Sequence, residues 1–382
     1  MGSIAMLIDR MKRNVVNIPG WSTSRKIVVF ESDDWGSIRV RSNEDVAAMR
    51  RAGFNLDNSS FYQFDALECN DDLTALFEIL SKHRDSVGRH PIFTLVSNVA
   101  NPVFEKIEQS GFSEYFWEPF IETLKRFPQH DRVYALHKEG VDQKLTYPVF
   151  HGREHLYVRR WMRLLQQANQ SALTAFHHGA CSNMYGIGGE YLGELPAAFD
   201  LEFASDLEYL HSVIDEGLKT FEQIWGFKAR YFVAPNGPFN NSLEKDLFDR
   251  GVEYILGEKH QNEPLGDGRY KKHYRWMGMR NRLGQTYLAR NCFFEPGIME
   301  GGLCEQPIER GLKTIERAFR WHKPAIISSH RVNYAGFLNP KQRKHGLVLL
   351  DRFLLEIKRR WPDVEFMSSV ELGDFITGKS NK

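Results

Sequence analysis

The sequence is poor in cysteine, has no excess of one charge and contains no long apolar run. Its 382 residues include 50 Lys and Arg against 49 Asp and Glu, so charge gives no support for a nucleic-acid or anionic-membrane partner. Charged residues interrupt positions 1–20, and no later stretch has the length of a transmembrane helix. The cysteines lack the paired spacing of a disulfide framework or a cysteine zinc site: Cys69, Cys181, Cys292 and Cys304. We expect a cytoplasmic protein without a transmembrane segment, whose oligomeric state the sequence does not indicate.

Apolar strands alternate with amphipathic helices along the whole sequence. Apolar runs predict strands at 26–30, 91–96, 145–150, 172–176, 230–233, 251–256, 286–290, 324–329 and 364–367. No composition break, proline-rich linker or repeat marks a second domain. We therefore predict an α/β fold, one elaborated parallel (β/α) barrel in a single domain over residues 1–382, with its core from about 26 to 375.

Two adjacent carboxylates, Asp33 and Asp34, follow the first predicted strand. In parallel α/β folds the carboxyl ends of the strands carry the chemistry. Neighbouring aspartates repel each other unless a cation or a proton separates their roles. The pair therefore suggests a metal site, and an ordinary turn rich in Asp and Gly is the alternative.

Histidines follow two of the later strands. His151 and His155 come after the strand at 145–150, and residues four apart on a helical turn share one face, so both imidazoles can reach one ion. His330 ends the strand at 324–329. One carboxylate and two imidazoles leave a position open on a zinc-like ion, as in catalytic sites. A second carboxylate and a third histidine then remain for proton transfer.

These motifs resemble those of the polysaccharide deacetylases, metal-dependent enzymes of the carbohydrate esterase family 4 type. The family's Asp-Asp-Gly turn is matched by residues 32–36, with Trp35 inserted before the glycine. Its His-x-x-x-His motif is matched by His151 and His155, and its late histidine by His330. The resemblance covers nearly the whole chain and implies a distorted (β/α)7 barrel of the glycoside hydrolase/deacetylase type with insertions.

The resemblance also implies a role for each of these residues. Asp34, His151 and His155 would hold a divalent metal, with Zn2+ expected from this donor set. Asp33 would be the general base and His330 the general acid. Substrate contacts are implied at four positions: Trp35, Pro235, Asn236 and Arg230.

The sequence departs from the family's pattern at three places. The arginine expected two residues before the third-motif proline is Val233, and the leucine expected two residues before the late histidine is Ser328. The fourth motif survives only as residues 273–276. A backbone N–H near Asn236 would still help the metal to hold an oxyanion.

Three functions are compatible with these residues. The first is a metal-dependent hydrolase, an N- or O-deacetylase acting on an amino sugar, an oligosaccharide or a surface-polysaccharide precursor. The second is a glycosidase or other C–N hydrolase on the same barrel, with Asp33 as nucleophile or base. The third is a catalytically inactive carbohydrate-binding homologue. The metal site itself has an alternative, in which Asp34, His151 and His155 are only polar side chains at a barrel mouth.

Overall fold

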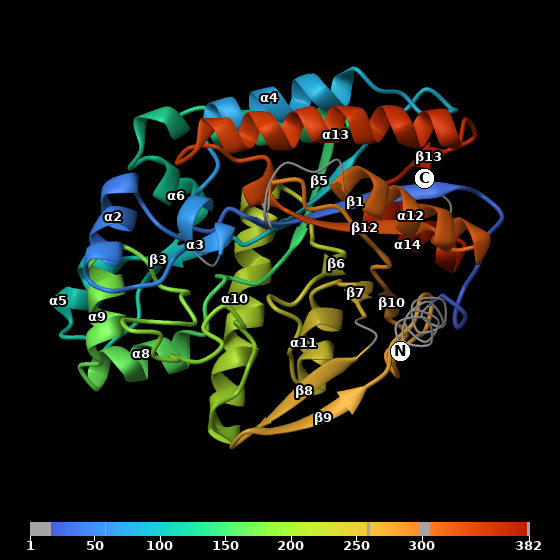
Figure 1. Ribbon diagram of the computed structural model, residues 1–382. Helices are drawn as coiled ribbons and strands as arrows, with labels where there is room; N and C mark the ends of the chain where they lie inside the picture. Colours follow the sequence, from blue (N-terminus) through green and yellow to red (C-terminus); the bar gives the residue numbers. More distant parts are fainter. Residues whose placement is uncertain (1–16, 58, 258–259, 298–305, 380–382) are drawn as a thin grey trace, which may run out of the picture.

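A parallel sheet surrounded by helices forms the centre of the protein, seen in a computed structural model that describes residues 17–57, 59–257, 260–297 and 306–379 (Figure 1). The strands of this sheet are β1 (Ile27–Trp35), β2 (Phe93–Ser97), β5 (Thr146–Phe150), β6 (Tyr231–Phe232), β7 (Tyr254–Leu256), β10 (Thr286–Leu288), β11 (Cys292–Phe293), β12 (Ala325–His330) and β13 (Glu365–Phe366). Their order is β10-β7-β6-β5-β2-β1-β12-β11, with β13 beside β1. Every pairing within this sheet is parallel.

One bent strand closes the sheet into a barrel. β10 pairs with β7 and β11 pairs with β12, yet only Ala289, Arg290 and Asn291 separate β10 from β11. At the break, the side-chain oxygen of Asn291 accepts a hydrogen bond from the backbone N–H of Ile326 (2.9 Å), so an amide side chain replaces part of the ladder. With β10 and β11 taken as one strand, the path is a ring of seven strands. The predicted distorted (β/α)7 barrel is confirmed.

Alternate residues of β1 face the two sides of the barrel wall. All nine residues of this strand are buried. Ile27 and Val29 belong to a cluster inside the barrel, whereas Val28 and Phe30 pack in the larger cluster under the helices. A continuous β-branched run thus forms a strand buried on both faces, as the sequence predicts.

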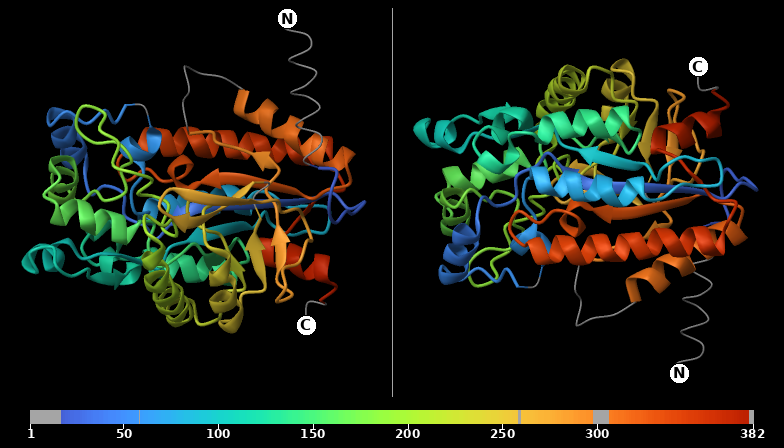
Figure 2. Two further views of the ribbon diagram at one scale, coloured as in Figure 1. Left: turned by 90° about the horizontal axis from the view of Figure 1, so that it is seen from below. Right: turned by 90° about the horizontal axis from the view of Figure 1, so that it is seen from above.

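The helices fill the connections between the strands and cover the outside of the barrel (Figure 2). In Figures 1 and 2, the helix of residues Asn70–Ser81 lies beside that of residues Pro340–Arg360. None of the helices in the described ranges is long and apolar enough to cross a membrane. The helices are α2 (Asn43–Arg51), α3 (Ser60–Phe64), α4 (Asn70–Ser81), α5 (Phe104–Gln109), α6 (Phe120–Leu124), α7 (Val133–Asp142), α8 (Val158–Gln166), α9 (Gln170–His177), α10 (Leu207–Trp225), α11 (Glu244–Asp249), α12 (Gln306–Arg320), α13 (Pro340–Arg360) and α14 (Ser369–Thr377).

Outside the barrel sheet, one predicted strand is a helix, and two small antiparallel pairs are present. The strand predicted at 172–176 is wrong, because these residues belong to α9, whose N-cap Asn169 accepts a hydrogen bond from the N–H of Ala172 (2.9 Å). A short apolar run does not distinguish a buried strand from a buried helix. The insertion after β7 forms a hairpin of β8 (Gln261–Gly266) and β9 (Arg269–His273). A second small antiparallel pair joins β3 (Ala100–Pro102) to β4 (Trp117–Pro119).

Candidate active site

An irregularity at the end of β1 turns both aspartates into the barrel. On a regular strand, neighbouring side chains point to opposite faces. The pairing of β1 with β2 shifts register between Ser32 and Trp35, and Asp34 has a positive φ of 80°. Asp33 and Asp34 therefore both line a cavity at the carboxyl ends of the strands. The same shift places the Trp35 ring in the cluster outside the barrel wall, where its Nε1 donates to Ser32 Oγ (3.0 Å).

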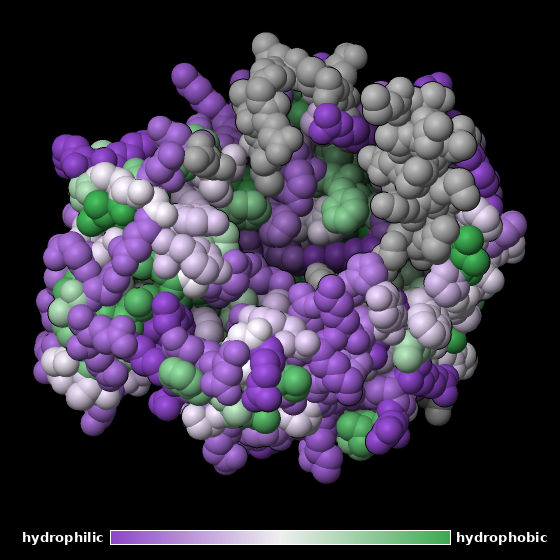
Figure 3. All heavy atoms as spheres, turned by 60° about the horizontal axis from the view of Figure 1, so that its bottom comes forward, coloured by the Kyte–Doolittle hydropathy of each residue, from purple (hydrophilic) through white to green (hydrophobic). Residues whose placement is uncertain are grey.

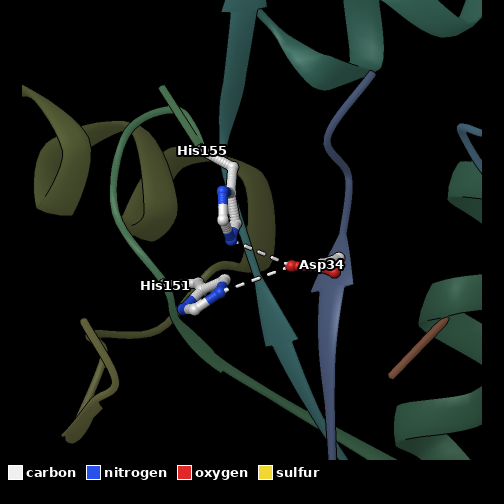
Figure 4. Close-up of side chains that lie close together, drawn as sticks. All are labelled: Asp34, His151 and His155. Atoms are coloured by element: carbon white, nitrogen blue, oxygen red, sulfur yellow. Dashed lines mark ion pairs between the residues drawn. The ribbon is translucent and has the colours of Figure 1, made fainter. Parts of the chain in front are cut away.

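Asp34, His151 and His155 converge from β1 and from the loop after β5 (Figure 4). Oδ1 of Asp34 lies 3.0 Å from Nε2 of His155 and 3.7 Å from Nε2 of His151. His151 Nδ1 donates to the backbone oxygen of Val233 (2.8 Å), which leaves the Nε2 lone pair directed at Asp34. His151 Nε2 and His155 Nδ1 are buried without a hydrogen-bond partner.

This group has the donors that a metal ion requires. One ligand atom from each residue lies within 4.8 Å of the others. Burial and the nearby Arg39 guanidinium lower the pKa of His155 to about 4, so its imidazole is neutral at neutral pH. Burial opposes charge on Asp34, but Arg39 and the two imidazoles outweigh it and hold the pKa of this carboxyl well below its usual range. Two imidazoles and one carboxylate could hold a metal ion such as zinc.

Arg290 holds Asp33 from the closing strand. Its Nη1 and Nη2 donate to the two oxygens of Asp33 at 2.7 and 2.5 Å, and its Nε donates to Glu31 Oε2 (2.5 Å). Burial raises the pKa of Asp33, but the Arg290 charge outweighs this effect and the pKa is lowered. The arginine that the family resemblance leads us to expect at Val233 is thus absent there, and Arg290 provides a guanidinium from another strand. The sequence indicates no role for Arg290, because its only signal is a lone charge that ends the predicted strand 286–290.

Glu295 holds His330, which lines the cavity next to Asp33. His330 Nδ1 donates to Glu295 Oε1 (2.7 Å), and Asn333 Nδ2 donates to Glu295 Oε2 (2.5 Å). Burial disfavours a charged imidazole, but the Glu295 carboxylate more than offsets it, and the pKa of His330 rises to about 9. The free Nε2 lies 3.9 Å from Asp33 Oδ2. The role of Glu295 is likewise not indicated, because nothing in its local sequence shows that it faces His330.

Buried carboxylates outnumber buried guanidinium groups in the networks behind the cavity. Ion pairs join five carboxylates to three arginines, and the members are Glu31, Asp33, Asp34, Asp65, Glu68, Arg39, Arg290 and Arg331. Uncompensated buried charge is costly. A cation bound at Asp34 would offset this excess of negative charge.

The cavity has a volume of about 780 Å³. A hollow with a largely hydrophilic floor is visible in Figure 3. Of the four expected substrate contacts, Asn236 lines the cavity and Pro235 stands beside it in the chain. The cavity is lined by Asp33, Asp34, Arg39, Asn55, Ser59, Phe61, Tyr62, His151, His155, Met184, Tyr185, Gly189, Pro196, Val233, Ala234, Asn236, Gly237, Leu256, Arg290, Ser328 and His330.

Trp35 and Arg230 do not line the cavity, which corrects the expectation that they contact substrate. Trp35 is fully buried in the outer cluster because of the register shift in β1. Arg230 precedes β6, at the end of the strand opposite to the cavity, and is paired with Glu253 and Asp374.

Comparisons with known proteins give structural similarity at low sequence identity. No protein-family model and no curated protein matches the sequence. A Mycobacterium smegmatis protein described as a polysaccharide deacetylase is 13% identical, covering 94% of this chain and 93% of its own, with a TM-score of 0.43. The α-amylase AmyC from Thermotoga maritima is 11% identical (92% and 74%, TM-score 0.46), and Puue allantoinase is 11% identical (95% and 96%, TM-score 0.45). Similarity at this level assigns the chain to no specific family.

Proposed function

We propose that the protein is a metal-dependent hydrolase that removes an acetyl group from nitrogen or oxygen. Its substrate is an amino sugar, an oligosaccharide or a surface-polysaccharide precursor. One observation carries the proposal. The group that could hold a metal, Asp34, His151 and His155, shares a cavity with an ionised carboxylate and a protonated imidazole, each fixed by a partner of opposite charge.

Asp33 is the proposed base. A divalent cation at Asp34, His151 and His155 supplies Lewis acidity, which activates water and polarises a carbonyl group. Asp33 lies beside this group and is ionised at neutral pH because Arg290 lowers its pKa. A carboxylate has about four lone-pair sites. After its two hydrogen bonds to Arg290, Asp33 can still accept a proton from water.

His330 is the proposed acid. Because the Nδ1–H donates a hydrogen bond to Glu295, Nε2 is the ring nitrogen left for the cavity, and a pKa of about 9 keeps the ring protonated at neutral pH. A departing amine needs that proton. Asn236 lines the same cavity with a φ of 54°, and we assign its backbone segment to the binding of the oxyanion.

The structure weakens the support for the two alternatives. A glycosidase of the common type places a carboxylic acid opposite its base or nucleophile. Here the group next to Asp33 is the His330 imidazole, with its Nε2 at 3.9 Å. The case for an inactive homologue rests on the arginine missing at Val233 and on Ser328 in place of the usual leucine. Arg290 supplies a charge to Asp33, whereas Ser328 does line the cavity, so only the first of these two arguments is weakened.

Metal content and turnover test the proposal together. We expect about one zinc ion per chain in the purified protein by mass spectrometry. His155→Gln should lose the ion, and His178→Gln, at the end of α9 outside the cavity, should keep it. With N-acetylglucosamine oligosaccharides, Asp33→Asn should keep the metal and lose turnover. A protein without metal, or turnover that survives removal of the metal, would refute the proposal.

A further inference from the structure

A second cavity, of about 390 Å³, adjoins the first. Arg290 belongs to the lining of both cavities, so at this point they are no more than one side chain apart. The remaining lining includes residues 274–277 and Lys323. A ligand longer than one sugar, with its reacting unit beside Asp33, would have to pass Arg290 to reach this second space.

The lining of the second cavity includes a buried cation, Arg275, whose guanidinium lies over the Tyr287 ring (4.5 Å) and has, within the described residues, only a distant carboxylate partner. The side chain of Arg275 is 9% exposed, and its Nε has no hydrogen-bond partner. Its closest carboxylate oxygen, Glu244 Oε1, is 3.8 Å away and already accepts a hydrogen bond from the hydroxyl of Tyr287. Arginine recognises carboxylate and phosphate groups through paired hydrogen bonds. Arg275 is therefore placed to take an acidic group from a ligand.

Two aromatic side chains beside Arg275 are exposed. Tyr274 is 58% and Trp276 is 39% exposed, and both line the second cavity. Large aromatic rings gain most when binding covers them, and they offer a flat apolar surface at little entropic cost. A pyranose ring has an apolar face of matching size, so these rings suit a sugar.

The surrounding segment, residues 269–282, is strongly basic. It contains six Lys and Arg and no Asp or Glu, whereas the remaining 44 Lys and Arg are outnumbered by 49 Asp and Glu. Lys271 and Lys272 on β9, with Arg280 and Arg282 beyond it, are exposed and have no ion pair within the described ranges. A local positive field on a nearly neutral protein attracts a polyanion.

We propose that the substrate is an anionic saccharide whose non-reacting part occupies the second cavity. Its acidic group, a carboxylate or a phosphate, binds Arg275, a neighbouring ring packs on Trp276, and further acidic groups lie along Lys271 and Lys272. This inference takes the position of the reacting sugar from the proposed function. It makes Arg275 a specificity-determining residue.

Binding measured by calorimetry tests this inference apart from turnover. The Asp33→Asn protein would be titrated with three tetrasaccharides: neutral N-acetylglucosamine, alternating glucuronate and N-acetylglucosamine, and a phosphorylated form of the first. At 50 mM salt we expect at least one acidic ligand to bind about tenfold more tightly than the neutral one, and the advantage to shrink at 300 mM salt. The acidic ligand that binds more tightly shows whether the protein prefers a carboxylate or a phosphate.

Variants then locate the preference. Arg275→Gln should remove most of this preference. The double variant Lys271→Gln/Lys272→Gln should do the same, and because both lysines are exposed it leaves the core intact. Trp276→Ala should weaken all three ligands. Arg359→Gln, an exposed arginine on α13, is the matched control and should change nothing. If Arg275→Gln melts early, the lysine pair decides the result alone.

Several results would overturn the inference. These are equal affinities at low salt, an undiminished preference in the lysine variant, or binding to phosphatidylglycerol vesicles without any preference among the saccharides. Preference for an acidic ligand without turnover by the wild-type protein would support this inference and refute the proposed function. Equal turnover and equal binding of neutral and acidic ligands would support the proposed function and refute this inference.

Discussion

The pair formed by Glu295 and His330 offers the sharpest test of the proposed chemistry. Replacing Glu295 with Gln removes a negative charge 2.7 Å from His330 Nδ1 and retains an oxygen that can accept its proton. Because Glu295 raises the pKa of His330, the variant should have a lower one. His330 must be protonated to act as an acid, so activity should be present below this pKa and lost as pH rises through it.

The size of the effect follows from the groups around the ring. The pKa of His330 rises from 6.5 to about 9 against the opposing effect of burial, with Glu295 the largest favourable contributor and Asp33 and Asp34 adding less. We expect Glu295→Gln to lower it by about 1 to 2 units, equivalent to about 1.4 to 3 kcal/mol. At pH 8 the protonated fraction would fall from about nine tenths to between about a tenth and a half.

Two measurements check this expectation. In the variant, the pH at which kcat/KM falls on the alkaline side should be lower by about 1 to 2 pH units, measured between about pH 6 and 10. Titration of the histidine rings by NMR should show the shift at His330 without any substrate. Asp351→Asn is the matched control, because Asp351 forms a similar pair with His83 (2.7 Å) and neither residue lines the cavity.

The outcomes separate the two assumptions. An unchanged His330 titration would mean that Glu295 does not set its charge. A shifted titration with an unmoved alkaline limb would mean that His330 is not the acid.

Three further predictions concern stability and metal. Arg290→Met leaves Glu31 and Asp33 buried without their cation, so we expect urea denaturation to show a loss of about 3–5 kcal/mol, together with loss of turnover; a stable variant would contradict the pairing. Gly346→Ala puts a Cβ 1.9 Å from the backbone oxygen of Asn333, so α13 must shift, and the same measurement should give a loss of about 1–3 kcal/mol. Chelation should lower the melting temperature, and added zinc should restore it; identical melting curves would argue against a bound ion.

Much of the barrel and part of the site could be predicted from the sequence because their signals are local. The apolar run before Asp33 and Asp34 marks a buried strand, and its end in a parallel fold is a fixed place for chemistry. His151 and His155 share a spacing that one turn of chain can bring together. Each of these signals lies within a dozen residues.

The partners of the proposed base and acid could not be predicted, because they depend on closure of the barrel. Arg290 reaches Asp33 only because the closing strand leaves β7 for β12 at that position, 257 residues away in sequence. The burial of Trp35 depends on one irregular residue, Asp34, whose positive φ no pattern of side chains indicates. The contact of Arg290 with Asp33 and the burial of Trp35 both depend on how the strands pair in the folded protein, and not on local sequence preference.

The bent strand that completes the barrel has a mechanical consequence. Its three-residue changeover, 289–291, both seals the wall and carries the guanidinium that anchors the acidic end of β1. Lengthening this changeover by a single residue would reverse which side chains of β11 point into the barrel. Residues 289–291 therefore serve both the closure of the barrel and the binding of Asp33, so a change in their length affects the fold and the site together.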